Sequence, residues 1–259
     1  MMRKPLIALA YALGLPVILI ALWWVASLGT TSIFMPKPVP LVTEFFETWI
    51  GARFFTDVLP SLGRFAAGTG IAIILGVLIG LLVGLNRSLR ALTEPVFEFF
   101  RAVPPPVLIP VFALVIGIGD DMRVAVIAFG AIWPVILNTI EGVRAADSVQ
   151  TETSRSYGIH GLNRVRYQVL PSAAPQILAG VRQSLPIGII LMVISEMLYT
   201  SSGLGFSIIQ FQRSFAVPQM WGGILLLGLV GFAVSMLFQL VERRILRWYY
   251  GLKDLQNAS

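Results

Sequence analysis

The sequence contains no cysteine and a single histidine, His160, among its 259 residues. The lack of cysteine excludes disulfides, thiolate metal sites and cysteine nucleophiles. One histidine is too few for a histidine-based metal site or catalytic triad, so we predict no metal site and no catalytic residue. Charge is also scarce, because 12% of the residues are Asp, Glu, Lys or Arg, against about 25% in soluble domains. So few charges cannot cover a water-exposed surface, which excludes a soluble protein.

Apolar residues make up 56% of the chain and form runs long enough to cross a lipid bilayer as helices. The predicted fold class is therefore an all-α polytopic membrane protein. We expect about six spans, at residues 6–28, 61–85, 95–118, 124–143, 177–198 and 221–241. The first run is longer than the core of a cleaved signal peptide and predicts an uncleaved anchor.

Residues 30–60 separate the first two runs and have a mixed composition. Phe45, Phe46 and Trp49 alternate with Glu44 and Glu47, a pattern typical of a helix that lies at a membrane interface. We therefore predict an extracytoplasmic linker in this region.

The basic residues predict the orientation. The net charge is +6, but the arginines cluster in short loops between apolar runs, so we expect no nucleic-acid partner. With the N-terminus inside, the inner loops hold twelve basic residues and the outer loops four. The positive-inside rule then places both termini in the cytoplasm. We interpret Arg64 and Arg182, which flank spans, as snorkelling side chains, with attraction of an anionic substrate as the alternative.

Three consecutive prolines interrupt the third apolar run. Pro104, Pro105 and Pro106 remove backbone donors and clash with the preceding turn, so we expect a broken or kinked helix. Broken helices at mid-membrane depth often line the substrate path of a transporter. A kink that only shapes packing is the alternative. In the second run, glycines recur every four residues from Gly76 to Gly84 and predict close packing against a neighbouring helix.

Polar side chains within the runs complete the candidates for a translocation path or gate, which are Arg101, Pro104, Pro105, Asn138 and Glu196. Arg101 follows Glu98 by three residues, and we expect the two charges to pair, because unpaired charges are costly in a membrane. Asn138 needs a partner, most simply on a neighbouring helix. Glu196 fits a structural ion pair, a gate or a substrate contact.

The longest polar stretch, ETSRSYGIHGLNRVRYQVLPSAAP, covers residues 152–175. Asp147 or Ser148 can cap a short helix that runs through Tyr157. Gly158 can end this helix in the left-handed conformation.

We expect a second short helix from Gly161 to about Leu170, stopped by Pro171. Two short helices joined at a glycine corner form a compact projection. Such a projection can dock on a soluble partner and transmit its motion into the flanking spans. A structured loop without a partner is the alternative.

This stretch resembles the EAA loop of ABC importer permeases, in which EAAxxxG is followed after nine residues by IxLP. The matching residues are Glu152, Gly158, Leu170 and Pro171. The departures are Thr153, Ser154 and Gln168. The stretches SLGRFAAGTGIAIILGVLIGLLVG, FRAVPPPVLIPVFALVIGIG and ISEMLYTSSGLGFSI are similar to the nitrate, sulfonate and taurine branch of the type I importer permeases.

The resemblance implies a binding-protein-dependent importer in the bacterial plasma (inner) membrane. The chain would have a core of five helices plus an N-terminal helix and would pair with a second permease, as a homodimer. Two cytoplasmic ATPase subunits would bind ATP and Mg²⁺, and an external binding protein would deliver nitrate, a sulfonate, taurine or a vitamin precursor. The chain itself would need no cofactor. It has no phosphate-binding GxxxxGK[ST] motif, so the ATPase is a separate chain.

The resemblance also divides the chain. Residues 1–56 would form an N-terminal helix and an extracytoplasmic linker, residues 57–243 the permease domain with a coupling loop at 144–175, and residues 244–259 a cytoplasmic tail. The residues implied in ATPase coupling are Glu152, Thr153, Ser154, Arg155, Ser156, Tyr157, Gly158, Leu170 and Pro171. Within this set, Glu152 and Arg155 can also form a local ion pair.

Two other functions are weighed against the importer. An ion-coupled secondary transporter could use Glu98, Glu141 or Glu196 as its proton carrier, but the two halves of the chain show no matching inverted repeats. An intramembrane enzyme would need a paired catalytic set, which the sequence lacks. The importer permease is therefore the favoured prediction.

Overall fold

A computed structural model describes residues 3–29, 32 and 34–251, and this part of the chain contains helices and no strand. The predicted all-α fold is confirmed. The long helices are α1 (Arg3–Leu28), α3 (Leu59–Leu85), α4 (Arg87–Ala102), α6 (Asp120–Arg144), α9 (Leu170–Met197) and α11 (Val217–Ile245). The shorter ones are α2 (Pro38–Glu44), α5 (Ile109–Ile116), α7 (Ser148–Ser156), α8 (Gly161–Arg164) and α10 (Leu204–Arg213).

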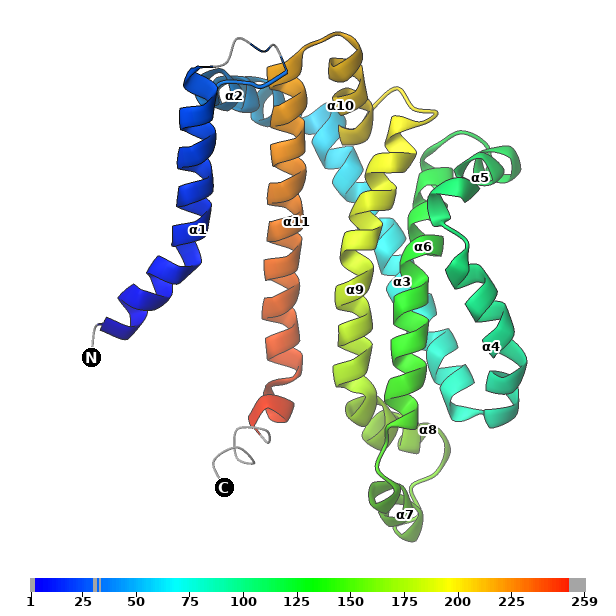
Figure 1. Ribbon diagram of the computed structural model, residues 1–259. Coiled ribbons are helices and arrows are strands. Elements are labelled where there is room, and N and C mark those ends of the chain that lie inside the picture. The colour runs from blue at the N-terminus through cyan, green and yellow to red at the C-terminus, as the bar shows by residue number, and fades with distance from the viewer. Residues whose placement is uncertain (1–2, 30–31, 33, 252–259) are drawn as a thin grey trace.

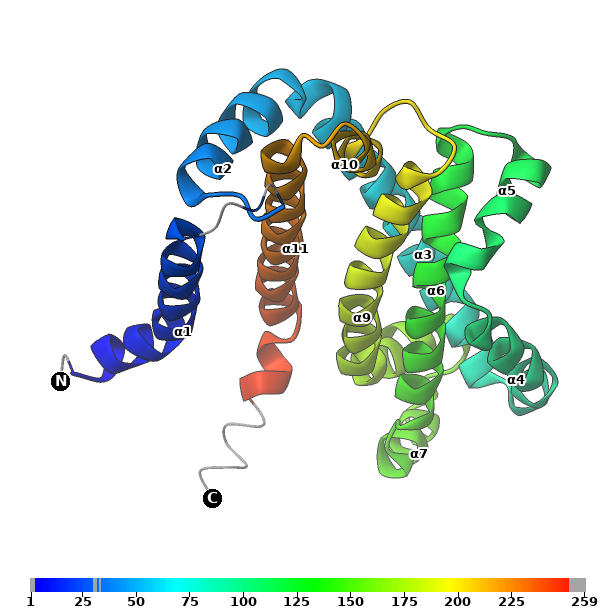
Figure 2. The same ribbon diagram turned by 45° about the horizontal axis from the view of Figure 1, so that its top comes forward.

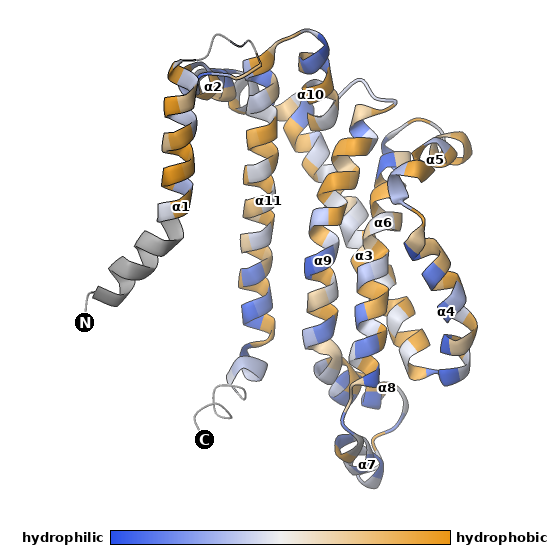
Figure 3. Ribbon diagram, viewed as in Figure 1, coloured by the Kyte–Doolittle hydropathy of each residue, from blue (hydrophilic) through white to orange (hydrophobic). Residues whose placement is uncertain are grey.

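Several helical segments are long and apolar enough to cross a membrane. Four of them are continuous, namely Phe54–Leu85, Asp120–Arg144, Gly161–Met197 and Val217–Ile245. Helix α4 and the segment Pro105–Ile116 make a fifth if they count together, and they are bent by 87°. Helix α1 adds a shorter apolar stretch, Gly14–Leu28. Figure 3 shows hydrophobic residues on the part of α1 next to α2 and along most of α11, whose last turns are hydrophilic.

Helices α3, α6 and α9 form the centre of the bundle (Figure 1). The glycines of α3 allow its backbone to approach α6 closely: a Cβ at Gly80 would lie 2.5 Å from the Cβ of Thr139. The same relation joins Gly76 to Val135 and Gly84 to Val143, so the two helices run parallel. The predicted glycine contact is confirmed. Helix α9 runs antiparallel to α6.

The proline break packs against both α6 and α9. Helix α4 ends at Ala102, a 3₁₀ turn covers Pro105–Leu108, and α5 follows. A Cβ at Gly130 of α6 would lie 2.1 Å from Leu191 of α9 and 3.1 Å from Pro105. The predicted break is confirmed. Residues 86–90, with Arg87 and Arg90, lie between the second and third apolar runs, where a short basic loop was expected. They instead begin α4, because the Asn86 side chain accepts hydrogen bonds from two backbone N–H groups and caps the helix.

The predicted interfacial helix at residues 30–60 is wrong for two of its three aromatic residues, because Phe45 and Trp49 are buried whereas Phe46 is 59% exposed. Helix α2 continues into π-helical segments at Phe45–Ala52 and Phe54–Val58, and these lead directly into α3. Trp49 is fully buried and donates its indole N–H to the carbonyl of Gln219 at 2.9 Å. The ring fits because α11 carries glycine at positions 222 and 223, opposite the indole.

The expected stop at Pro171 is also wrong. A π-helical segment, Val165–Val169, joins α8 to α9, and the helix is continuous from Gly161 to Met197. Pro171 follows this π-helical segment closely, and the helix continues through it because the wider turn changes the hydrogen-bond pattern just before the proline. The polar stretch thus provides the first turns of the span that follows it.

The two ends of the bundle differ. Helix α7, the start of α1 and the end of α11 lie at one end, and α2 and α10 lie at the other (Figure 1). We refer to these as the α7 end and the α10 end. Helix α1 lies apart from the central bundle, on the far side of α11, as Figures 1 and 2 both show.

Candidate functional site

Helix α7 projects from the bundle between α6 and α8 (Figure 1). Its first turn is capped by the Asp147 carboxylate, which accepts a hydrogen bond from the backbone N–H of Val149 at 2.8 Å. Beyond its last turn, Gly158 has a φ of +69°, which glycine adopts without strain. The predicted short helix, with its cap and its glycine end, is confirmed.

Gln168 attaches α7 to the span that follows. Its side chain is 7% exposed. Its Nε2 donates to the Thr151 hydroxyl at 2.9 Å, and its Oε1 accepts from Arg164 at 3.2 Å. A second bond joins α7 to α9, from the Ser172 hydroxyl to Gln150 at 3.3 Å. Gln168 stands where the EAA pattern has isoleucine, and sequence reasoning treated it only as a departure.

Most of the residues implied in coupling share the exposed surface of α7. These are Glu152, Thr153, Arg155, Ser156, Tyr157 and Gly158. Tyr157 is 80% exposed, whereas Ser154 is buried against the bundle. Leu170 and Pro171 lie apart from them, at the start of α9. The expected ion pair between Glu152 and Arg155 is absent from the described part of the chain.

A groove with a volume of about 770 Å³ adjoins α7. One side is formed by α7 and the start of α9, and the other includes Trp248 and Tyr249, which follow α11. Helix α7 is therefore accessible along the side that lines the groove as well as at its end, near Tyr157. This geometry is suited to insertion of α7 into a partner.

The candidate path residues lie in three places: beside the proline break, on α6 at Asn138, and at the α10 end at Glu196. Arg101 forms an ion pair with Glu98 at 2.6 Å, as expected, and both side chains are more than half exposed. The pair lies near the end of α4, just before the break at Pro104 and Pro105, and Pro105 packs against Gly130 of α6. Asn138 of α6 lies eight residues further along, about 12 Å toward the α7 end.

Asn138 has partners on its own helix and on the next one. Its Nδ2 donates to the carbonyl of Pro134 at 2.8 Å and to Oε1 of Gln183 on α9 at 3.5 Å. The expectation of a partner on a neighbouring helix is confirmed. Gln183 is exposed midway along α9, and sequence reasoning did not single it out. Figure 3 shows hydrophilic positions on α4 and midway along α9.

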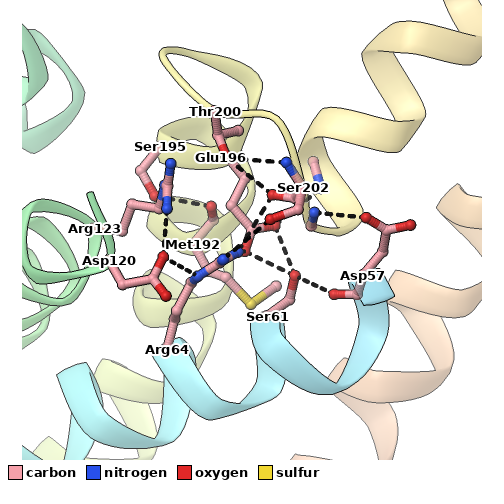
Figure 4. A network of polar contacts seen from close by, with 12 residues as sticks. Asp57, Ser61, Arg64, Asp120, Arg123, Met192, Ser195, Glu196, Thr200 and Ser202 are labelled. Atoms are coloured by element: carbon pink, nitrogen blue, oxygen red, sulfur yellow. Dashed lines mark hydrogen bonds and ion pairs between the residues drawn. The ribbon is translucent and has the colours of Figure 1, made fainter. Parts of the chain in front are cut away.

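Glu196 belongs to a buried network at the α10 end (Figure 4). Its carboxylate is fully buried and accepts hydrogen bonds from Arg64 Nη1 at 2.7 Å, from the Ser61 hydroxyl at 2.7 Å and from the backbone N–H of Gly205 at 3.1 Å. Gly203, with a φ of +120°, is needed here because a Cβ would lie 2.6 Å from the Glu196 carboxylate.

Charged groups from α3, from α6 and from the π-helical segment Phe54–Val58 before α3 complete the network. Arg64 is 7% exposed and also donates to Asp120 at 2.8 Å, and Asp120 in turn pairs with Arg123. Asp57 accepts from the backbone N–H of Gly203 at 2.8 Å. The network therefore fixes the loop between α9 and α10 to the starts of α3 and α6. Snorkelling, the interpretation favoured for Arg64, is wrong.

Arg182 is also paired rather than snorkelling. It lies midway along α9 and forms an ion pair with Glu242 near the end of α11. Glu98 and Glu141, the other carboxylates considered as proton carriers, also have arginine partners. Glu141 pairs with Arg144 at 2.7 Å, and Glu98 pairs with Arg101. Among the described residues, no group of three His, Asp or Glu side chains is arranged to hold a metal ion.

Residues 72–247 match the model of the family described as the binding-protein-dependent transport system inner membrane component. The chain belongs to this family. The predicted membership is confirmed, and the chain is a permease subunit of an ABC importer.

Relatives in this permease family cover nearly the whole chain. The putative aliphatic sulfonates transport permease protein SsuC of Bacillus subtilis (strain 168) is 31% identical over 236 residues, which are 90% of this chain and 86% of the relative. The taurine transport system permease protein TauC of Escherichia coli (strain K12) is 25% identical, with 92% and 89% covered. The bicarbonate transport system permease protein CmpB of Synechococcus elongatus is 29% identical, with 93% and 90% covered.

A solved structure supports the permease fold. The inward-facing MetNI methionine ABC transporter superposes with a TM-score of 0.63 and 19% identity, over 73% of this chain and 94% of that chain. The type I importer fold predicted from the sequence is therefore confirmed.

Proposed function

We propose that residues 57–243 form one half of the solute path of an importer in the bacterial inner membrane and that α7 couples this path to a separate ATPase. The ATPase subunits, two in each assembly, would bind ATP and Mg²⁺, and the permease would catalyse no reaction itself. The observation that carries the proposal is the attachment of α7: its tip is exposed at Tyr157, while Gln168 ties its inner side to α9. Force applied to the tip thus reaches a membrane span directly.

The position of α7 between α6 and α9 favours this role. Helix α6 ends at Arg144, shortly before α7 begins, and α8 leads from α7 into α9 without a break. A displacement of α7 therefore acts on two packed spans at once. At their other ends, these spans carry Asp120 and Glu196 of the buried network.

The distribution of basic residues supports a cytoplasmic α7 end. The loops and helix ends there carry Arg87, Arg90, Arg144, Arg155, Arg164, Arg166, Arg243, Arg244 and Arg247. The α10 end carries fewer, namely Lys37, Arg53, Arg64, Arg123 and Arg213. The positive-inside rule counts Lys and Arg, so we expect the α7 end in the cytoplasm. Both termini would then be cytoplasmic, and the short tail from 244 onward would lie at that surface.

We propose that the path is lined by Arg101, Pro104, Pro105 and Asn138 and that Glu196 anchors the outer loop instead of contacting the solute. The guanidinium of Arg101 is paired but more than half exposed, and such a group in a membrane helix favours an anionic solute. The relatives transport aliphatic sulfonates, taurine and bicarbonate according to their names. We infer a small solute that carries an oxyanion.

The solute class is tested by uptake into cells that express the full transporter. A labelled sulfonate should accumulate in an ATP-dependent manner, and Arg101→Gln should reduce uptake about tenfold or more. Arg244→Gln, a change of the same charge at an exposed position outside the path, should leave uptake unchanged. Equal uptake by the two variants would refute the role of Arg101.

The complete importer would contain a second copy of this chain, as a homodimer, and an external binding protein at the α10 end. A purified assembly that contained a different second permease would overturn the homodimer.

Coupling is tested by site-directed cross-linking, for which the absence of cysteine is convenient. Ser156→Cys places a thiol on the exposed face of α7, and Ser214→Cys places one at an exposed position at the α10 end. We expect a nucleotide-sensitive cross-link from position 156 to a co-expressed ATPase and none from position 214. Transport without such a cross-link, driven by a proton gradient, would refute the coupling role.

A further inference from the structure

A second cavity lies between α9 and the end of α11 and has a volume of about 640 Å³. It is separate from the groove beside α7 and from the candidate path residues. Its lining is Arg182, Gln239, Glu242, Arg243, Arg247, Tyr250 and Gly251. The cavity is thus formed by polar and charged groups from two membrane helices.

The charges around this cavity do not balance. Three arginines face one carboxylate, and that carboxylate, Glu242, already pairs with Arg182. Arg243 and Arg247 form no ion pair within the described residues. Two planar guanidinium groups on one wall of a cavity suit an oxyanion, because each can donate two parallel hydrogen bonds.

The position of the cavity along α11 indicates where the oxyanion comes from. The apolar run of α11 ends at Val241, and Glu242 and Arg243 follow. Trp248, Tyr249 and Tyr250 come next, as in the aromatic belts that mark the level of the lipid headgroups. On the bilayer side, Leu237 and Leu240 are 63% and 62% exposed and offer an apolar surface to acyl chains.

We propose that this cavity binds the phosphate of an anionic phospholipid. The phosphate oxygens accept hydrogen bonds from Arg243 and Arg247, and the acyl chains lie along α11 beyond Leu240. Basic cavities between membrane helices on the cytoplasmic side are suited to such headgroups. The lipid would sit beside the Arg182–Glu242 pair, which joins α9 to α11. The proposal does not depend on the solute or on the role of α7.

The test uses the intact transporter, reconstituted in phosphatidylcholine with a minor fraction of phosphatidylglycerol. Lipid retained after extraction is counted by native mass spectrometry. The doubly substituted R243Q/R247Q protein should retain phosphatidylglycerol about 30-fold more weakly, since each arginine contributes about 1 kcal/mol and 1.4 kcal/mol is a factor of ten. The matched control, R87Q/R244Q, removes the same charge from exposed positions outside the cavity and should change retention less than threefold.

Several results would overturn the proposal. Equal retention by the two double variants would show that only the general surface charge matters. Equal retention of phosphatidylcholine and phosphatidylglycerol by the unsubstituted protein would exclude a site for an anionic headgroup. Displacement of phosphatidylglycerol by soluble ethanesulfonate would assign the cavity to the solute. If R243Q/R247Q does not assemble, Arg247→Gln alone should weaken retention about fivefold, and unchanged retention in that variant refutes the site.

The lipid site and the proposed function fail in different ways. Loss of the position-156 cross-link would refute coupling and leave lipid retention unaffected. Loss of selective lipid retention would leave the cross-link in place.

Discussion

Replacement of Glu196 by glutamine removes the central negative charge of the network at the α10 end. Glutamine keeps the size of the side chain, and its carbonyl oxygen can still accept hydrogen bonds from Ser61 and Gly205. The change therefore isolates the ion pair with Arg64, whose side chain is 7% exposed. We expect the variant to be less stable because a buried guanidinium loses its closest carboxylate.

The size of the effect follows from the contacts that remain. Removing one partner of a buried ion pair lowers the free energy of unfolding by about 3–5 kcal/mol. Arg64 keeps its bond to Asp120 at 2.8 Å, and Asp120 is 62% exposed, so we expect a value near the lower limit, about 3 kcal/mol. For a chain of this size, 1 kcal/mol lowers the unfolding temperature by about 2–4 °C. The expected loss is therefore roughly 6–12 °C.

The assay is thermal unfolding of the detergent-solubilised protein, followed by the loss of the monodisperse peak in size-exclusion chromatography. Glu98→Gln is the matched control. The Arg101–Glu98 pair has an N–O distance of 2.6 Å, close to the 2.7 Å of the Arg64–Glu196 pair, but both of its side chains are more than half exposed. An exposed pair should contribute at most about 1 kcal/mol to stability. Equal shifts for the two variants would refute the reasoning. The double replacement of Arg64 and Glu196 by methionine should recover part of the loss, since it leaves no unpaired charge.

Three further perturbations separate packing from coupling. Gly80→Val should lower stability by about 1–3 kcal/mol through overpacking against Thr139. The control Gly70→Ala, with no atom within 4 Å of the new Cβ, should be neutral or stabilising in the same thermal assay. Equal losses of stability in the two variants would argue against the close contact between α3 and α6. Tyr157→Ala should leave the unfolding temperature unchanged, because the side chain is 80% exposed, but should lower uptake by the complete transporter severalfold; normal uptake would contradict a docking role. Gln168→Leu should reduce the yield of the position-156 cross-link to the ATPase, and an unchanged yield would show that α7 is held by other contacts.

Local signals in the sequence predicted local structure well. The proline triplet at 104–106 predicted the break in the third span, and Asp147 and Gly158 predicted both ends of α7. Each of these features depends on the backbone of the residues concerned and of their immediate neighbours. The helical spans followed from the length of the apolar runs, and the glycine contact of α3 followed from the four-residue spacing of its glycines.

Partners distant in the sequence could not be predicted. Trp49 was placed at an interface because its neighbours alternate with glutamate, but two glycines on α11 open a place for its indole in the core. Arg64 was placed at an interface because it lies near the end of an apolar run, but Glu196, 132 residues away, neutralises it. The choice between an exposed and a buried arginine depends on which carboxylate the fold brings near, and composition does not contain that information.

Pro171 illustrates a different limit. Proline breaks a regular α-helix because it lacks an N–H group and its ring clashes with the carbonyl four residues earlier. Here the π-helical segment at Val165–Val169 widens the helix just before Pro171, and the helix continues. The same arrangement occurs at Pro60, which follows the π-helical segment Phe54–Val58. A change of helical pitch before a proline leaves no simple pattern in the sequence.

The glycine contact between α3 and α6 restricts which movements the permease can make. The contacting pairs Gly68–Ile127, Gly76–Val135, Gly80–Thr139 and Gly84–Val143 keep one fixed offset over the length of both helices. A shift of α3 along α6 by one residue would drive side chains of α6 into backbone that has no space for them. This packing opposes sliding between the two helices, and we expect them to move as one unit. Relative motion is then expected at places that this packing does not lock, such as the 87° bend between Arg87–Ala102 and Pro105–Ile116.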